Sequence, residues 1–558
     1  MQMASLVLGR RRAGVVASVV VAGLVVLCTA ALTGAFAGTS NTAQTNSAKQ
    51  QFAQHLLKTG AAQLMTWPAQ AFLRIQATGD RQLAPALAGR PALPSGTAGG
   101  AAAPAVPSAN LRNVRVNNPA LDTHEADQTT QSETTIAEAG SHVAVGYNDS
   151  QQTGLFFTAG SDITGYSYSA NGGKTFTDGG VLPNAPEFNN LGDPWMASGR
   201  NGTMYYSTLA GDNLNLNLDV AVARSTNGGK TWSAPVPVFR PPFAIGYSGD
   251  KDALAVGPDP MVHARDNLYV AYDDFSFDSV TGQATTGLPV ARSTDGARTW
   301  QLTYADKFTL PTTGCSFQQY IGATPIVDTV TGTLYVTAEK IAVDDPNCTG
   351  TAPATLSESI FKSTDGGQTF GAGVKIADVT AATPNGLLFL GPGRYARTAE
   401  FPSIALRGGT IYVAWNDGAQ GHSHIRLATS TNGGSTWSVR FVTSGGGDEV
   451  QPALSADSHG LHLLYYHRYP NNTINVLIGN SLNGTSFITK RVTSQPFRGT
   501  LTIPQFDPII AFGYMGDYIA NASNGSRDYF AWGDNRGSVT DFLYPHGRND
   551  PDVFFAKQ

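Results

Sequence analysis

Acidic side chains recur at two positions of a repeated pattern of short apolar segments, where they could act as general acids and bases or as hydrogen-bond acceptors. One position lies at or just before the first segment of a unit, and the other lies at the end of the second segment. We expect both positions to meet at one face, round the mouth of a central channel, and to form an acidic ligand-binding crown. Because turns also favour Asp, part of this pattern needs no function. The predicted binding residues are Glu133, Asp149, Asp274, Asp417, Asp517 and Asp534.

Arginine and tyrosine side chains near the same face complete a set of catalytic candidates. Three guanidinium groups can bind a carboxylate through paired hydrogen bonds, and Arg394 and Arg397 lie in an insertion directly before Glu400. Arg468 and Arg536 follow the second segment of their units. The alternative is that these are ordinary surface charges. The catalytic candidates are Asp193, Asp252, Arg394, Arg397, Glu400, Tyr514 and Arg536.

The sequence contains no Cys/His cluster with the spacing of a zinc site. Its histidines are scattered, and its cysteines are Cys28, Cys315 and Cys348. We therefore expect no metal site and no cofactor, with a calcium ion in the acidic mouth as an alternative.

One phrase indicates how these residues are positioned. The phrase STNGGKTW, from Ser225 to Trp232, returns four times in similar form and once in a worn form that begins at Ser481. Its Asp or Asn can accept hydrogen bonds from backbone N–H groups ahead of it, its glycines supply positive φ, and its last aromatic residue can be buried. Each copy is therefore predicted to be a hairpin turn. The structural Asp and Asn residues are Asn171, Asn227, Asp295, Asp365 and Asn432.

Each phrase follows three strand-like segments and precedes a fourth, which predicts four-stranded antiparallel blades and an all-β propeller. The last unit, from Gly516 to Gln558, lacks the phrase and supplies three strands. Its outer strand could come from Leu111–Asn118, which would tie the two ends of the propeller together. We predict seven blades, with six blades and an appended C-terminal segment as the alternative.

The phrase resembles the Asp-box, or bacterial neuraminidase repeat, and residues 119 to 558 resemble the propellers of the sialidase superfamily. In an active member, the resemblance implies an arginine triad, a Tyr–Glu nucleophile pair and an Asp acid/base. The Phe/Tyr-Arg-Ile-Pro stretch that carries the first family arginine is absent from the sequence. The only Arg-Ile pair, Arg74-Ile75, lacks the proline and precedes the propeller. Asp-boxes also occur in noncatalytic proteins, so the resemblance does not assign an activity.

The chain is predicted to have three parts. Residues 1–37 combine Arg10–Arg12 with an apolar run that ends in Ala35-Phe36-Ala37, which is typical of a secretory signal peptide, with a membrane anchor as the alternative. Residues 38–110 are expected to be partly helical and then an Ala/Pro/Gly-rich linker, and residues 111–558 form the propeller. Export predicts an oxidising compartment, in which Cys315 and Cys348 would form a disulfide.

The net charge of −5 provides no basic surface for nucleic acid. We predict a secreted or cell-surface monomer that binds a carbohydrate or an extracellular protein on its acidic face. It would contact a membrane only through an uncleaved N-terminal segment. The alternatives are a sialidase-like glycoside hydrolase with a divergent site and a noncatalytic surface scaffold.

Overall fold

The fold is described from a computed structural model of the whole chain. The structure describes residues 50, 53, 54, 77, 106–123, 129–152, 162–212, 217–242, 245–278, 280–349, 352–383, 386–392, 394–499, 515–525, 527–540 and 545–558. Residues 1–37, most of residues 38–105, and Tyr514 lie outside the described residues.

Antiparallel strands in consecutive units make up most of the described chain. The first units contain β2 (Gln131–Ala139), β3 (His142–Asp149), β4 (Thr164–Ser169) and β5 (Thr177–Asp178), then β7 (Trp195–Ser198), β8 (Met204–Asp212), β9 (Leu218–Ser225) and β10 (Val236–Pro237). The next contain β11 (Ile245–Pro258), β12 (Asp266–Asp278), β13 (Gln283–Ser293) and β14 (Gln301–Thr309), then β15 (Phe317–Val327), β16 (Leu334–Val343), β17 (Ala354–Ser363) and β18 (Val374–Val379).

The remaining units follow the same order. They contain β21 (Ser403–Arg407), β22 (Thr410–Asp417), β23 (His424–Ser430) and β24 (Ser438–Phe441), then β25 (Asp448–Ala456), β26 (Leu461–Arg468), β27 (Thr473–Ser481) and β28 (Ile488–Arg491). The last sheet has the order β1 (Val114–Arg115), β32 (Arg548–Lys557), β31 (Asp528–Val539) and β30 (Ala520–Ser523). Smaller elements are η3 (Pro119–Leu121), β6 (Phe188–Asn190), β29 (Phe497–Arg498) and the hairpin of β19 (Leu387–Phe389) and β20 (Tyr395–Arg397).

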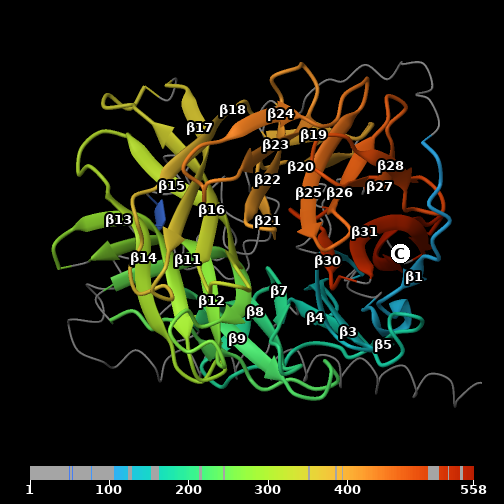
Figure 1. Cartoon of the computed structure of the whole chain (residues 1–558), viewed down its shortest axis with the longest axis horizontal. Coiled ribbons are helices and arrows are strands. Elements are labelled where there is room, and N and C mark those ends of the chain that lie inside the picture. Colours follow the sequence, from blue (N-terminus) through green and yellow to red (C-terminus); the bar gives the residue numbers. More distant parts are fainter. Residues whose placement is uncertain are drawn as a thin grey trace, which may run out of the picture.

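The units surround a common centre. In Figure 1 they follow one another round the molecule in chain order, with β7, β21 and β30 toward the middle. One central cavity is lined by residues in or just before the first strand of every unit, from Thr134 on β2 to Tyr518 before β30. This arrangement of four-stranded antiparallel units is a β-propeller.

Alternation along the strands explains why both faces of each sheet are buried. On β22, Ile411, Val413 and Trp415 pack into the core shared with the preceding unit, whereas Tyr412 and Ala414 pack into the core shared with the following unit. Successive side chains of a strand point to opposite faces, so a continuous apolar run fills two adjacent cores.

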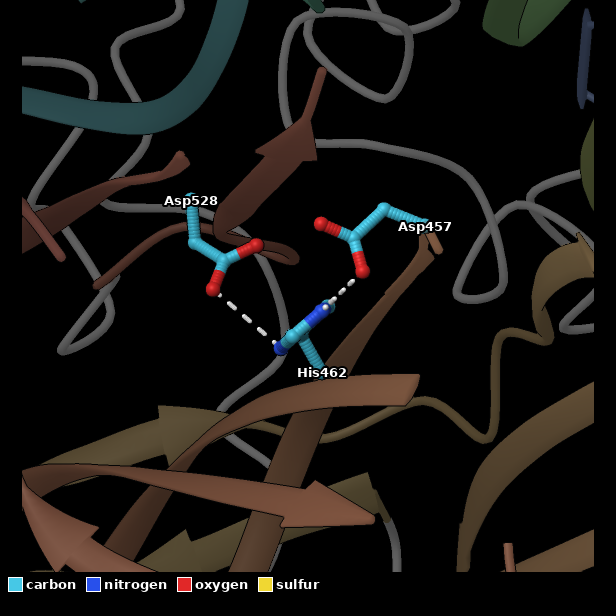
Figure 2. A group of neighbouring side chains, drawn as sticks. All are labelled: Asp457, His462 and Asp528. Atoms are coloured by element: carbon cyan, nitrogen blue, oxygen red, sulfur yellow. Dashed lines mark hydrogen bonds and ion pairs between the residues drawn. The ribbon is translucent and has the colours of Figure 1, made fainter. Parts of the chain in front are cut away.

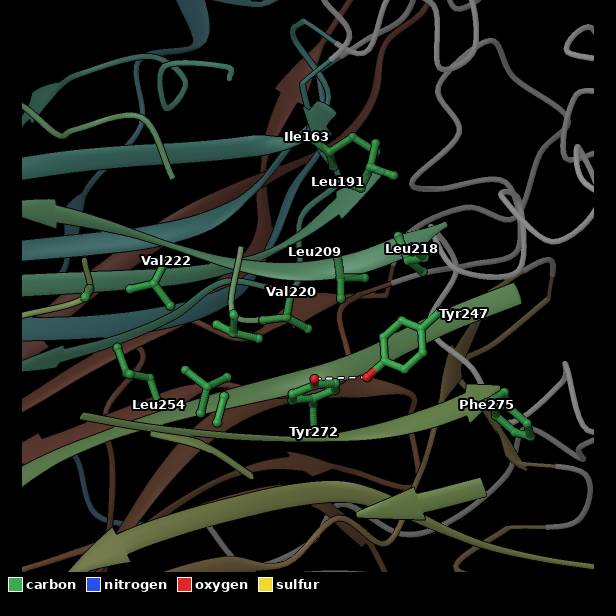
Figure 3. Packing of buried hydrophobic residues seen from close by; sticks show 14 of the residues in the cluster. Ile163, Leu191, Leu209, Leu218, Val220, Val222, Tyr247, Leu254, Tyr272 and Phe275 are labelled. Carbon is green, nitrogen blue, oxygen red and sulfur yellow. Dashed lines mark hydrogen bonds between the residues drawn. The ribbon is translucent and has the colours of Figure 1, made fainter. Parts of the chain in front are cut away.

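The core between β8–β9 and β11–β12 shows the same packing in more detail. Figure 3 shows Val220, Val222 and Leu254 side by side, with Tyr272 nearby. The Tyr247 hydroxyl donates to the Tyr272 hydroxyl at 2.9 Å, so a polar pair inside this apolar core is satisfied (Figure 3).

Each copy of the repeated phrase joins the third strand of a unit to the fourth. In the first copy, Asn171 Oδ1 accepts the N–H groups of Lys174 and Thr175 at 3.0 and 3.1 Å, and Ser169 Oγ accepts that of Gly173 at 2.9 Å. Gly173 has φ +76°, and a Cβ there would lie 2.3 Å from the Phe555 ring. Glycine is therefore required both for the turn and for its close approach to the neighbouring sheet.

The same hydrogen bonds recur at the other copies, where an Asp or Asn carboxyl or amide oxygen accepts from the backbone four positions ahead. These contacts are Asn227 to Thr231, Asp295 to Thr299, Asp365 to Thr369 and Asn432 to Thr436, each at 3.0 Å.

The sheet at the ends of the chain combines distant segments. Val114 on β1 is antiparallel to Phe555 on β32, and the Asn117 amide donates to Asp552 at 3.0 Å. Phe555 is 1% exposed and packs against Phe176 of the first unit, with 5.0 Å between ring centroids. The N-terminal strand, the C-terminal strand and the first unit therefore share one core.

Other contacts concern the segments outside the sheets. A disulfide joins Cys315 and Cys348. Ala53 and Ala77, within the segment expected to be helical and then a linker, are buried in the core of β8–β12, so part of that segment contacts the propeller. In the parts of the chain that the structure describes, no helix has the length and apolarity needed to span a membrane.

Phe555 provides a test of how the ends of the chain are packed. Phe555→Ala should lower the free energy of unfolding by about 3–5 kcal/mol because it leaves a cavity among Phe176, Tyr529 and β1. Leu482→Ala, at a residue 74% exposed, is the control and should change it by less than about 0.5 kcal/mol. Equal effects of the two substitutions on the urea midpoint would contradict this packing.

Candidate functional site

The central cavity is the main candidate site. It has a volume of about 230 Å³ and is lined by aromatic, small and charged side chains from all the first strands. The aromatic side chains are Trp195, Phe401 and Tyr518, and the charged ones are Lys251, Asp252 and Asp517. Concave sites with a few polar groups among apolar ones are the usual place for ligand binding.

The backbone beside this cavity has an unusual conformation in several first strands. Glu133, Asp193, Lys251 and Gln451 have φ values between +50° and +55°, although none is a glycine. The strand pairing shifts register at Ser132/Thr135, Asp250/Ala253 and Val450/Ala453. Such bulges redirect side chains and are common near binding sites, and the unfavourable φ must be maintained by surrounding contacts.

Hydrogen bonds between units hold these bulges in place. Asn148, at the end of β3, donates to Glu133 Oε2 at 2.9 Å and accepts the Asp193 N–H at 2.9 Å. Glu133 Oε1 accepts the Asp517 N–H at 3.0 Å. In another unit, Asn416 accepts the Gln451 N–H at 3.3 Å. The bulges at Glu133 and Gln451 are thus bonded to polar residues of a neighbouring strand or unit.

Lys251 is the most unusual group in the cavity. It is 4% exposed, and its Nζ lies 3.3 Å from the centroid of the Tyr518 ring and 5.2 Å from that of Phe401. Within the described residues, Nζ has no hydrogen-bond partner. A cation–π contact compensates only part of the lost hydration of an ammonium group, so its donors are available to a ligand.

Two carboxyl groups beside Lys251 are held close to the neutral form. Burial, then the charge of Glu133, raises the pKa of Asp193 well above its usual range, and neither of its oxygens has a hydrogen-bond partner among the described residues. Burial also raises the pKa of Asp252 to about 7, although Ser207 and Lys251 oppose this rise. Perturbed carboxyl groups in a cavity are candidates for proton transfer and ligand binding.

The acidic crown expected from the sequence differs from the observed arrangement. Its predicted binding residues are almost entirely buried, with exposures of 0 to 5%, and most are engaged by internal donors. Tyr304 donates to Asp274 at 2.5 Å, Arg426 donates to Asp417 at 3.0 Å, and Gln131 donates to Asp149 at 3.1 Å. These carboxyl groups bond to neighbouring strands instead of forming an open acidic face, although Asp517 lines the central cavity. The complete set is Glu133, Asp149, Asp274, Asp417, Asp517 and Asp534.

The arginine candidates have separate partners instead of a shared ligand. Arg397 donates to Asp517 at 2.9 Å, so it lies next to the cavity. Arg394 donates to the Gly499 carbonyl, Arg468 to Asp448 at 2.8 Å, and Arg536 to Asp534 at 2.9 Å. The four guanidinium groups therefore neutralise or cap different parts of the fold and do not form a triad on one carboxylate.

A second acidic group was missed by the sequence analysis. Glu339 on β16 and Glu358 on β17 are directly paired across the strands, and burial, then neighbouring glutamates, raises both pKa values well above the usual range. Burial raises the pKa of Glu400 to about 7. The signal for Glu339 was a carboxyl side chain near the end of a second strand, at the position that Asn416 takes in the next unit, one residue before Asp417.

Glu449 has the opposite environment. Burial alone would raise its pKa, but hydrogen bonds from His424 at 2.5 Å and His467 at 2.6 Å lower it below the usual range. The Glu449 bond in turn raises the pKa of His424. This group is internally satisfied and does not line the central cavity.

Comparison with known proteins adds little beyond the architecture. No protein-family model and no curated protein matches the chain. Among solved structures, a protein of unknown function from Dyadobacter fermentans has a TM-score of 0.38 and 14% identity, and the match covers 68% of this chain and 98% of that one. An ulvan lyase has a TM-score of 0.42 and 11% identity over 64% and 80% of the two chains. The phage phi92 endosialidase has a TM-score of 0.41 and 9% identity over 80% and 69%. Because these TM-scores and identities are low, we assign the fold from the strand pairing of the chain itself.

The buried carboxyl of Asp252 predicts that stability depends on pH. Its pKa is about 7 in the folded chain and about 3.9 in an unfolded one, so the folded state retains a proton that the unfolded state releases. The stabilisation that this proton gives the folded state is fully present below about pH 4 and is lost as the pH rises through about 7. Asp252→Asn should therefore reduce the fall in the free energy of unfolding between about pH 4 and pH 8, by an amount on the order of a few kcal/mol.

Urea unfolding at several pH values between about 4 and 8 measures this effect. Asp378→Asn, at a carboxylate with 80% side-chain exposure, removes the same charge outside the cavity and is the control. If the free energy of unfolding depends on pH equally in Asp252→Asn and in the wild type, the raised pKa is contradicted.

Proposed function

We propose that the chain is a seven-bladed propeller that acts outside the cytoplasm as a monomer and binds a carbohydrate in its central cavity. The sheet that contains both β1 and β32 would be the seventh blade and close the ring. An extracytoplasmic location is supported by Arg10–Arg12 with the apolar run after them, and by the disulfide between Cys315 and Cys348.

One observation carries the proposed binding function. The cavity places the ammonium group of Lys251 and the carboxyl group of Asp252 beside the aromatic rings of Trp195 and Tyr518. A sugar ring combines hydroxyl groups, which need donors and acceptors, with apolar C–H faces, which pack on aromatic rings. The volume of about 230 Å³ is smaller than the usual range of roughly 300–1,000 Å³ for drug-sized ligands, and this favours a single sugar unit over a larger group.

A glycoside hydrolase is the second candidate, and it is favoured by the contrast between two carboxyl groups of the cavity. Asp252 has a pKa of about 7 and could donate a proton, whereas Asp517 accepts a hydrogen bond from Arg397 at 2.9 Å. Glycosidases use such a pair, one acid and one carboxylate. The separate arginine partners weigh against a sialidase-like reaction on an acidic sugar.

Trp195 tests carbohydrate binding. Trp195→Ala should weaken binding at least about tenfold because buried aromatic residues at the centre of a site often carry the largest share of affinity. A glycan array would identify the ligand, and calorimetry would compare the variants. Met261→Ala is the control, since Met261 is 76% exposed in the turn between β11 and β12. An equal loss of affinity in both variants, or no loss of affinity in Trp195→Ala, would contradict the proposed site.

Asp252 distinguishes binding from hydrolysis. If the chain is a hydrolase, the wild type should release a fluorophore from at least one aryl glycoside, and Asp252→Asn should slow this release roughly 10²–10⁴-fold while ligand still binds. Turnover of no substrate by a folded, ligand-binding wild type would exclude the hydrolase and leave the binding function.

A further inference from the structure

Three side chains with metal-binding atoms converge at the opposite end of the last two units. Asp457 lies in the turn between β25 and β26, His462 is on β26, and Asp528 begins β31. One ligand atom of each lies within 4.8 Å of those of the other two, and Figure 2 shows the imidazole between the two carboxyl groups. Because Gln451 marks the cavity end of β25, this group lies at the other end of the strand from the carbohydrate site.

The contacts of the His462 ring indicate which nitrogen is free to bind a cation. Nδ1 lies 2.8 Å from the amide oxygen of Asn480 and 3.2 Å from Asp528 Oδ2, so it has acceptors for a proton. Nε2 lies 3.0 Å from Asp457 Oδ1. With the proton on Nδ1, the Nε2 lone pair and an anionic oxygen face each other, and this contact is favourable only with a cation or a second proton between them.

A second proton on the ring would leave another group unsatisfied. Asp528 is 5% exposed, and its Oδ1 has no hydrogen-bond partner among the described residues. Figure 2 shows the second oxygen of Asp528 pointing toward the carboxyl group of Asp457, away from the bond to the imidazole. A buried carboxylate oxygen without a partner is unfavourable. A cation bound to the Nε2 lone pair, in the plane of the ring, could be shared by Asp457 and this oxygen.

We propose that Asp457, His462 and Asp528 bind a divalent transition-metal ion, of which Zn²⁺ is the best fit. Imidazole nitrogen and carboxylate oxygen are common zinc ligands, whereas Ca²⁺ prefers oxygen alone. His459, with 69% side-chain exposure, lies beside this group, with its Nδ1 at 3.2 Å from Asp457 Oδ2. Since Asp457 and His462 belong to the sixth unit and Asp528 to the sheet of β1 and β32, the metal would join these two units.

Calorimetry with the untagged full chain, stripped with EDTA, tests this site directly. Wild type should bind one equivalent of Zn²⁺ near pH 7.5, and it should bind Ca²⁺ more weakly. Asp528→Asn and His462→Gln should each weaken Zn²⁺ binding at least about tenfold. The matched control Asp378→Asn removes the same charge at an exposed position and should bind Zn²⁺ as the wild type does. Absence of stoichiometric Zn²⁺ binding by the wild type, or binding unchanged in both ligand variants, would overturn the proposal.

A measurement on the wild type alone covers the case in which the variants fail to fold. Zn²⁺ should raise the thermal unfolding temperature near pH 7.5, and the rise should be much smaller near pH 5, because protons compete with the metal for its ligands. No rise at the higher pH, or an equal rise at both, would overturn the site.

Discussion

The burial of charged groups where the innermost strands begin is the constraint on which the rest of this propeller depends. A carboxylate removed from water needs donors or a proton, and in several units a neighbouring strand or unit supplies the donors. Asn148 contacts both the carboxylate of Glu133 and the backbone of Asp193, so one amide joins two units at the centre. The same contacts maintain the positive φ values of Glu133 and Asp193. Polar bonds between units therefore shape the cavity, while the apolar cores between sheets provide most of the stability.

At the cavity, some buried charged groups lack the hydrogen-bond partners that such groups have elsewhere in the fold. Asp417 is bonded to Arg426 and Asp534 to Arg536, and such groups have little left to offer a ligand. Lys251 has an aromatic contact in place of a hydrogen bond, and Asp193 has neither oxygen bonded among the described residues. Groups that the fold leaves unsatisfied are the ones that a ligand can satisfy. This contrast places the candidate site near Lys251 and moves it away from the acidic residues that are most evident in the sequence.

The repeated architecture could be predicted from the sequence because its signals are local. The phrase from Ser225 to Trp232 contains its own hydrogen-bond acceptors and its own glycines, and the apolar runs carry the period of a strand. The pairing of β1 with β32 could also be predicted, because the last unit has three strand-like segments and one candidate partner before the first unit.

The candidate site could be predicted only in part, because it depends on contacts between distant residues. Sequence analysis selected Asp193 and Asp252 by their position but did not select Lys251, since nothing local shows that a bulge turns its side chain over Tyr518. The grouping of Asp457 with Asp528 depends on how two units meet, and sequence spacing does not show it. The arginine hypothesis was wrong for a related reason, since each arginine is closest to a carboxylate or carbonyl of its own surroundings.

The most direct measurement of the central claim, that carboxyl groups at the cavity stay protonated near neutral pH, is an infrared titration of the protonated-carboxyl stretching band in the folded chain. Exposed Asp and Glu lose this band at pH values near their ordinary pKa of about 4. We predict that part of the band persists to about pH 7 and that Asp252→Asn removes some of this persistent part. A band that vanishes completely by about pH 5 in the folded wild type would show that the buried carboxyl groups are ionised and would contradict the account.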